Sequence, residues 1–202
     1  WLSFCKKDIH SFKPDVIILI DYGGFNMRVA KFATQNKFKV FYYISPKVWA
    51  WNVKRAWKLK STVDRMFCIL PFEKDFFKKF GWDVDYVGNP VLDAVKAFKP
   101  NENFLKENKL EDKDKFIALL PGSRKIELER MNPLLTDVVR QFPHYHFVVA
   151  AIRELEETLY QPYRLLQNVS FVFDATYDLL SNAHAAIVTS GTATLETGLF
   201  KV

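Results

Sequence analysis

The chain has 202 residues, of which 49% are hydrophobic and 26% are charged, as in folded globular proteins. This composition excludes a disordered chain, and no apolar run reaches the roughly 18 residues of a membrane-spanning helix. Lys and Arg outnumber Asp and Glu by 29 to 23, and the net charge of +6 suits phosphate-bearing ligands or an anionic membrane surface.

The first residue is Trp1 and no signal peptide is present, so we expect a piece of a longer protein with both ends truncated. The two cysteines, Cys5 and Cys68, form neither a metal-ligand spacing nor a disulfide framework. A reducing cytoplasm is therefore expected.

Short runs rich in β-branched and aromatic residues predict eight strands. In chain order they cover 16–20, 40–44, 66–70, 84–87, 116–120, 147–151, 169–173 and 185–189. Helical patterns lie between them, for example over 75–80, 125–142 and 177–183. Several strands are apolar at nearly every position, which indicates parallel sheets covered on both faces. The alternation predicts an α/β fold.

Residues 96–115 interrupt this alternation of strands and helices, because 11 of these 20 residues are charged. We place a boundary there, with one lobe over 1–96, a charged linker over 97–115 and a second lobe over 116–202. Four strands on each side predict two Rossmann-like lobes with parallel sheets that face each other across a cleft.

Four of the seven glycines closely follow predicted strands: Gly23, Gly88, Gly122 and Gly191. Ligands of open α/β sheets bind at the carboxyl ends of strands, where glycine lets a phosphate approach backbone N–H groups. For any single glycine a tight turn is an equally good interpretation. Their clustering favours a ligand edge.

The first of these loops carries a carboxylate, Asp21, directly after an apolar strand. It could serve as a base or as a helix cap. We favour the base, because Asp21 lies a few residues before the helix expected to start near Phe25.

Two later loops predict an anion site for a nucleoside diphosphate. One contains Gly122, Ser123 and Arg124, and the other contains Ser190, Gly191, Thr192 and Glu196. Arg at a helix start can bind a diphosphate and stabilise a leaving group, and Glu196 could accept from ribose hydroxyls. The alternatives are Ser123 as an ordinary N-cap, Arg124 in solvent and Glu196 as a partner of the helix dipole. Neither loop matches the Walker A or Gly-x-Gly-x-x-Gly pattern, which disfavours an ATPase or an NAD-dependent dehydrogenase.

An aromatic and basic stretch contains Trp49, Trp51, Lys54 and Arg55, with further Trp and Lys residues up to Lys60. It suits an anionic membrane surface or an acylated, phosphorylated ligand. The alternative is a core tryptophan pair beside a solvated helix. The four histidines show no metal-ligand spacing, so we expect no metal site.

These loops together resemble one family, the lipid-A-disaccharide synthases, from about Lys13 to the last residue. The segments that carry the resemblance are Ile20-Asp21 with Phe25-Asn26, Ser45 to Trp51, Leu70 to Lys74, Val87 to Pro90, Leu120 to Arg124 and Ser190 to Glu196. Their order and spacing are far more specific than any single loop.

The resemblance implies a GT-B-like glycosyltransferase with an acceptor and lipid side in the first lobe and a UDP-sugar side in the second. The implied reaction joins UDP-2,3-diacylglucosamine to 2,3-diacylglucosamine 1-phosphate, with inversion, and releases UDP. It also implies a cytoplasmic enzyme, peripheral on the inner membrane of a Gram-negative bacterium. No metal or cofactor is implied. We expect no nucleic-acid partner, because Lys and Arg do not form one long stripe and no RNA-binding aromatic signature is present.

By position, the resemblance makes Asp21 and Arg124 the catalytic pair and assigns UDP to Gly122, Ser123, Arg124, Ser190, Gly191, Thr192 and Glu196. For the acceptor, lipid or membrane we consider Asn26, Trp49, Trp51, Lys54, Arg55 and Asn89. Two positions depart from the family pattern: Gly24 stands where an Asp is common, and Asn89 where a His is common. Asn89 cannot titrate, so it receives no proton-transfer role.

Two other functions stay open. One is another UDP-sugar enzyme of the same architecture, such as a GT-B transferase or a UDP-N-acetylglucosamine 2-epimerase. The other is a non-catalytic module that binds an anionic membrane.

Overall fold

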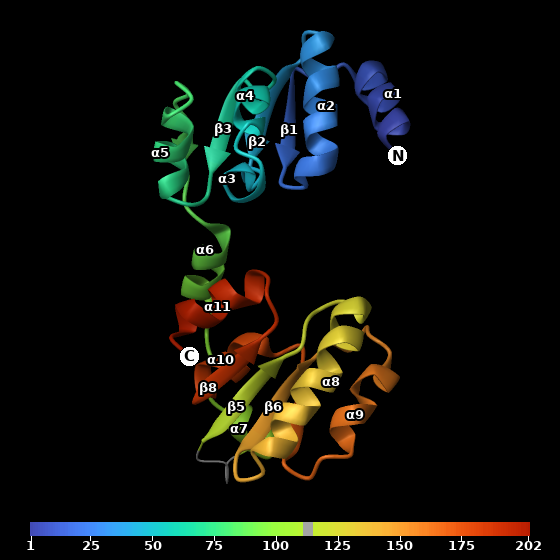
Figure 1. Cartoon of the computed structure of the whole chain (residues 1–202), viewed down its shortest axis with the longest axis vertical. Helices are drawn as coiled ribbons and strands as arrows, with labels where there is room; N and C mark the ends of the chain where they lie inside the picture. Colours follow the sequence, from blue (N-terminus) through green and yellow to red (C-terminus); the bar gives the residue numbers. More distant parts are fainter. Residues whose placement is uncertain (111–114) are drawn as a thin grey trace. The chain divides into compact units, whose positions relative to one another are not determined.

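The computed structural model describes residues 1–110 and 115–202, which divide into two compact units, Trp1–Pro90 and Val91–Val202 (Figure 1). Each unit has its own four-stranded parallel sheet. The predicted α/β class with two parallel sheets is therefore confirmed. Within the described ranges, no helix combines the length and hydrophobicity needed to cross a membrane.

The first unit is a sheet whose strands follow one another in chain order. The order is β1 (Val16–Ile20), β2 (Lys39–Tyr43), β3 (Arg65–Cys68) and β4 (Asp85–Tyr86). The register pairs Ile17 with Val40 and Phe41 with Arg65. The helices are α1 (Leu2–Phe12), α2 (Gly23–Gln35), α3 (Val48–Trp51), α4 (Arg55–Lys60) and α5 (Phe72–Lys78).

The core of the first unit lies on one face of its sheet. Leu19 and Tyr42 are buried there against residues of α2, α4 and α5. On the other face Ile18 and Ile20 are 59% and 58% exposed. The expected cover on both faces is therefore wrong for β1. Right-handed crossovers between strands that advance in a single direction place every connecting helix on the same side.

The second unit reverses direction within its sheet. The strands are β5 (Phe116–Leu120), β6 (His146–Ala151), β7 (Val169–Phe173) and β8 (Ala185–Val188), in the order β7-β6-β5-β8. The helices are α6 (Pro90–Ala97), α7 (Phe104–Glu107), α8 (Lys125–Gln141), the 3₁₀ helix η1 (Glu157–Tyr160), α9 (Gln161–Arg164), α10 (Thr176–Asn182) and α11 (Thr192–Phe200).

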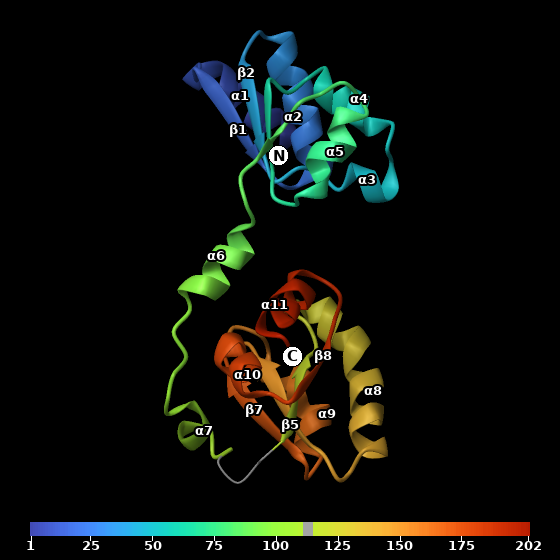
Figure 2. The ribbon, with the colours of Figure 1, turned by 90° about the vertical axis from the view of Figure 1, so that its left-hand side faces the viewer.

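Because of this reversal, helices cover both faces of the second sheet. Leu119 and Phe147 pack with residues of α8 and α9 in one core cluster. Ala118 and Val148 pack with residues of α7 and α10 in the other, and Figure 2 shows α8 and α10 on opposite sides of the sheet. The order changes direction between β5 and β8, the position at which ligands bind in open α/β sheets.

All eight predicted strands have a counterpart in the structure, with ends displaced by at most two residues. The boundary between the units differs from the predicted linker over 97–115, because it falls after Pro90. Phe104 and Leu110 are buried in the second core, since apolar residues in this charged segment pack against the sheet. Residues 111–114 of the predicted linker lie outside the described residues.

Candidate nucleotide site and acidic loop

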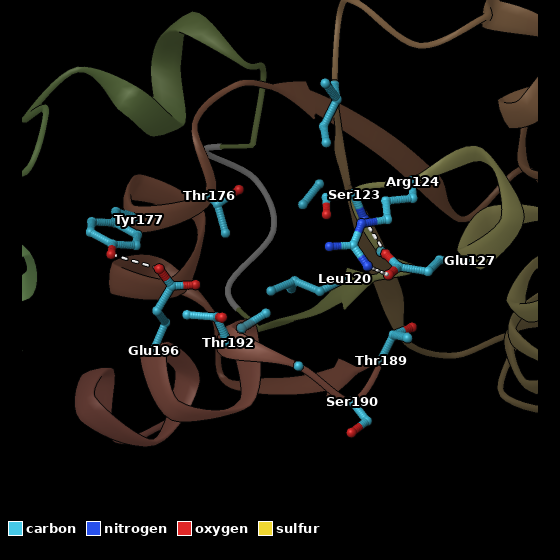
Figure 3. A pocket seen from close by; sticks show the side chains of 15 residues that line it. Leu120, Ser123, Arg124, Glu127, Thr176, Tyr177, Thr189, Ser190, Thr192 and Glu196 are labelled. Carbon is cyan, nitrogen blue, oxygen red and sulfur yellow. Dashed lines mark hydrogen bonds and ion pairs between the residues drawn. The ribbon is translucent and has the colours of Figure 1, made fainter. Parts of the chain in front are cut away.

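A pocket of about 530 Å³ opens at the carboxyl ends of β5 and β8 in the second unit (Figure 3). The loop after β5 and the loop after β8 form its walls, and the start of α10 contributes Thr176 and Tyr177. The pocket therefore lies at the point where the strand order reverses. The two loops are close because β5 and β8 are adjacent in the sheet: Leu120 pairs with Val188, which lies 68 positions later in the chain.

The loop after β5 has a backbone that requires glycine. Gly122 has φ +124°, and a Cβ added there would lie 2.6 Å from Glu127 Cβ. The Ser123 N–H donates to Glu127 Oε2 at 2.8 Å. Arg124 is at the N-cap of α8, and its side chain makes no capping hydrogen bond with the described residues. The alternative of Ser123 as the side-chain N-cap is therefore wrong, because Glu127 reaches back to the backbone instead.

Glu127 was not selected from the sequence, yet it lines the pocket. Its Oε1 lies 3.5 Å from Arg124 Nη1, and Figure 3 shows its carboxylate folded toward Ser123 and Arg124. A phosphate at this helix start would use the same amide and guanidinium, so Glu127 and such a ligand would compete for them. A Glu three residues into a helix is a known capping signal and could have been recognised.

The loop after β8 leads directly into α11. Gly191 has φ +155°, and the Thr194 hydroxyl donates to its carbonyl oxygen at 2.6 Å. The Thr189 hydroxyl is inaccessible to solvent and has no hydrogen-bond partner among the described residues. Thr189 also lines the pocket. A buried hydroxyl without a partner is costly, but an oxygen that solvent cannot reach is also out of reach of a ligand in the pocket.

The structure brings all predicted UDP-binding residues to this pocket. Its lining includes Gly122, Ser123, Arg124, Ser190, Gly191, Thr192 and Glu196. Glu196 accepts a hydrogen bond from the Tyr177 hydroxyl, a partner that the sequence did not indicate. Their role in binding UDP stays a prediction.

The loop that carries Asp21 is held through its main chain. Both Asp21 and Tyr22 have positive φ, 44° and 42°, a conformation in which Asp is better tolerated than most residues. The Asp21 carbonyl accepts from Asn26 Nδ2 at 2.8 Å and from the Tyr42 hydroxyl at 2.6 Å. Burial raises the pKa of Tyr42 well above its usual range. None of these hydrogen bonds involves the Asp21 carboxylate.

A smaller pocket of about 180 Å³ in the first unit is lined by Asp21, Gly24, Lys47, Trp51 and Arg55, among others. Three of the predicted site residues thus lie together. Asp21 is exposed within its own unit. Beside the carboxylate, Lys47 and Arg55 offer positive charge for a phosphorylated ligand.

Two residues predicted to contact the acceptor or lipid make hydrogen bonds within the first unit. Asn26 is buried and donates both amide protons to backbone carbonyls, those of Ile20 and Asp21. Trp49 is partly buried, and its indole N–H donates to Glu73 Oε1 at 3.2 Å. The core interpretation therefore holds for Trp49, because a buried carboxylate satisfies its N–H. Trp51 is 88% exposed.

The predicted basic stretch does not form one surface. Lys60 donates to the carbonyls of Phe80 and Gly81 and lines a different pocket, which also contains Lys37. Lys54 and Arg55 are exposed. Asn89 is partly exposed and lines neither the 530 Å³ nor the 180 Å³ pocket. In the described part of the chain, no three His, Cys, Asp or Glu residues are grouped as a metal site would require.

Glu73 is a second residue that sequence analysis missed, and it is 1% exposed. Its carboxylate accepts from the Ser45 hydroxyl, the Trp49 indole and the Leu70 N–H. It therefore joins the loop after β2 to the start of α5 and fixes the segment that lines the Asp21 pocket. Three donors thus satisfy this buried side chain.

We expect Glu73→Ala to lower the free energy of unfolding by roughly 2–4 kcal/mol, because the donors on Ser45, Trp49 and Leu70 would lose their acceptor in the core. Urea unfolding followed by tryptophan fluorescence measures the change. Asp75→Ala, at an exposed position of the same helix, is the control and should change stability by less than about 0.5 kcal/mol. Equal stability of the two variants would contradict a structural role for Glu73.

The two units with parallel sheets define a GT-B-like fold, and solved structures agree. The complex of Staphylococcus aureus MnaA with UDP has a TM-score of 0.66 at 13% identity, over 98% of this chain and 60% of that one. The UDP-GlcNAc 2-epimerase from Neisseria meningitidis bound to UDP-GlcNAc gives 0.63 at 16% identity, over 94% and 58%. At such identities the likeness shows the fold alone.

Sequence comparison identifies the family to which the chain belongs within this fold class. The family model for lipid-A-disaccharide synthetase matches residues 3–202. The lipid-A-disaccharide synthase of Syntrophus aciditrophicus is 41% identical over 96% of this chain and 52% of the relative, and synthase 1 of Legionella pneumophila (strain Lens) is 36% identical over 97% and 53%. The chain belongs to the lipid-A-disaccharide synthetase family. It spans about half the length of these curated relatives.

Proposed function

We propose that the full-length protein joins UDP-2,3-diacylglucosamine to 2,3-diacylglucosamine 1-phosphate, giving lipid A disaccharide 1-phosphate and UDP. Family membership supports this reaction. The observation that carries it is the 530 Å³ pocket, which collects both anion-binding loops at the switch point of the second sheet. Two helix N-termini and one arginine at such a point suit a nucleoside diphosphate.

In the proposed mechanism Asp21 accepts the proton of the acceptor 6-hydroxyl as its oxygen attacks the anomeric carbon. The bond to UDP breaks on the opposite face of the sugar, which inverts the configuration. Arg124 and the N-termini of α8 and α11 stabilise the negative charge that develops on the departing diphosphate. With these groups we propose that the reaction needs no metal or organic cofactor.

The direct test supplies the full-length protein with both lipid substrates and measures UDP together with the disaccharide. A deacylated acceptor should react poorly if the enzyme recognises the lipid. A 2-epimerase would instead convert a UDP-sugar to its epimer without any acceptor. A binding module that is not an enzyme would release no UDP above the buffer control.

We also propose that the protein works at the cytoplasmic surface of the inner membrane of a Gram-negative bacterium. The supporting feature is a basic-aromatic surface formed by Lys47, Trp51, Lys54 and Arg55, all exposed. Exposed tryptophan beside basic residues suits an anionic interface. Because Trp51 and Arg55 also line the Asp21 pocket, this surface could present a lipid acceptor to the base.

Replacing both Lys54 and Arg55 by Gln should weaken binding to anionic vesicles, measured by sedimentation, about 30-fold, since each basic residue near such a surface contributes about 1 kcal/mol. The matched control replaces Lys37 and Lys39 by Gln, which removes the same charge from exposed positions elsewhere in the unit. Equal vesicle binding by the two double variants would remove the basic-aromatic surface from the proposal.

A further inference from the structure

Tyr177 makes the one hydrogen bond to the Glu196 carboxylate that the described residues show. Its hydroxyl donates to Glu196 Oε1 at 2.8 Å. Tyr177 belongs to the first turn of α10 and Glu196 to α11. Both line the 530 Å³ pocket, and Figure 3 shows them at the end opposite Arg124 and Glu127. The contact therefore bridges two helices on the pocket wall.

An aromatic cluster fixes the ring of Tyr177. Its centroid lies 5.4 Å from that of Phe98, edge to face, and 5.1 Å from that of Phe200. Phe98 and Phe200 also contact each other at 5.8 Å. The next residue, Asp178, accepts a hydrogen bond from the Asn101 N–H at 2.7 Å. The phenol is thus anchored by residues from three segments of the second unit, and the direction of its O–H is set by packing.

The protonation state of Tyr177 gives the contact its direction. Burial, together with the bond to Glu196, raises the pKa of Tyr177 to about 12. The hydroxyl therefore stays protonated near neutral pH and donates to the carboxylate. Glu196 Oε2 receives no hydrogen bond from the residues that the structure describes, so one carboxylate oxygen is held while the other remains available to a ligand.

We propose that Tyr177 is a positioning residue that holds Glu196 with its second oxygen ready to accept hydrogen bonds from the ribose hydroxyls of a nucleoside diphosphate. The inference rests on the proposed function, because it places the ribose at the Glu196 end of the pocket and the diphosphate at the Arg124 end. A glutamate side chain loses conformational entropy when it binds a ligand. Because Tyr177 already restrains Glu196 in the free protein, less entropy is lost on binding.

The test compares two nucleotides and two proteins by titration calorimetry with the full-length protein. The nucleotides are UDP and 2′,3′-dideoxy-UDP, which lacks both ribose hydroxyls. We expect Tyr177→Phe to weaken UDP binding by up to about tenfold, because binding must then also immobilise the Glu196 side chain. Its affinity for the dideoxy nucleotide should equal that of the parent. Phe keeps the ring contacts, and thermal unfolding checks that the cluster is intact.

A second variant separates positioning from general stability. In a Glu196→Ala background, Tyr177→Phe should cause no further loss of UDP affinity, because the tyrosine acts through Glu196. Additive losses would overturn the inference, as would equal weakening of both nucleotides or unchanged UDP binding by Tyr177→Phe. If the unmodified protein binds UDP and the dideoxy nucleotide equally well, the inference about Tyr177 is wrong but the proposed UDP site still stands. A parent that binds no UDP would overturn the proposed function as well.

Discussion

The Arg124→Ala variant of the full-length protein is expected to lose on the order of 100-fold or more in kcat, because a preorganised positive group then no longer meets the departing diphosphate. Its stability should change little. The Arg124 side chain is 78% exposed, and its described ion pair is the 3.5 Å contact with Glu127. Exposed ion pairs of this kind contribute about 0–1 kcal/mol. Disaccharide formation and thermal unfolding, measured on the same sample, separate the two effects.

Two controls sharpen this result. Arg124→Lys keeps a positive charge but cannot form two parallel hydrogen bonds, so its rate should fall between those of the parent and the alanine variant. Arg130→Ala removes an exposed arginine from the same helix and should leave turnover unchanged. If Arg124→Ala forms the disaccharide at the parent rate, Arg124 has no part in the mechanism.

The Asp21→Asn variant is expected to lose about 100- to 10,000-fold in kcat, the range that a positioned general base supplies. Asn has the same shape and tolerates the positive φ of this position. The loop should stay folded, because its described hydrogen bonds use the Asp21 main chain, with the N–H bound to Tyr43 and the carbonyl to Asn26 and Tyr42. Steady-state turnover with both lipid substrates measures the loss.

The matched control is Asp15→Asn, which removes a carboxylate from an exposed position just before β1. Its turnover should equal that of the parent. UDP binding by Asp21→Asn should also be unchanged, because Asp21 is outside the 530 Å³ pocket. Turnover at the parent rate in Asp21→Asn would show that another group accepts the proton.

The contacts within the site show where inference from sequence stops. The loops that carry Gly122 and Gly191 follow apolar strands, so their place at the carboxyl edge of the sheet was predictable. Glu127 has a recognisable signal, because a Glu three residues into a helix commonly returns to the backbone. The bonds from Tyr177 to Glu196 and from Trp49 to Glu73 have no such signal. Each joins side chains about 20 residues apart, and the rotamers that let them meet depend on packing.

The sequence by itself determined the α/β class, the eight strands, the family and the residues of the two loops that line the 530 Å³ pocket, because strand periodicity and loop motifs are local properties of the chain. Only the tertiary structure decided that β8 lies beside β5, which brings those loops into one pocket. It alone also showed the hydrogen bonds that Asn26 and Trp49 make within the first unit, and it ended that unit at Pro90. Burial and hydrogen-bond partners depend on which elements become neighbours, and that follows from strand order and helix packing over the whole unit.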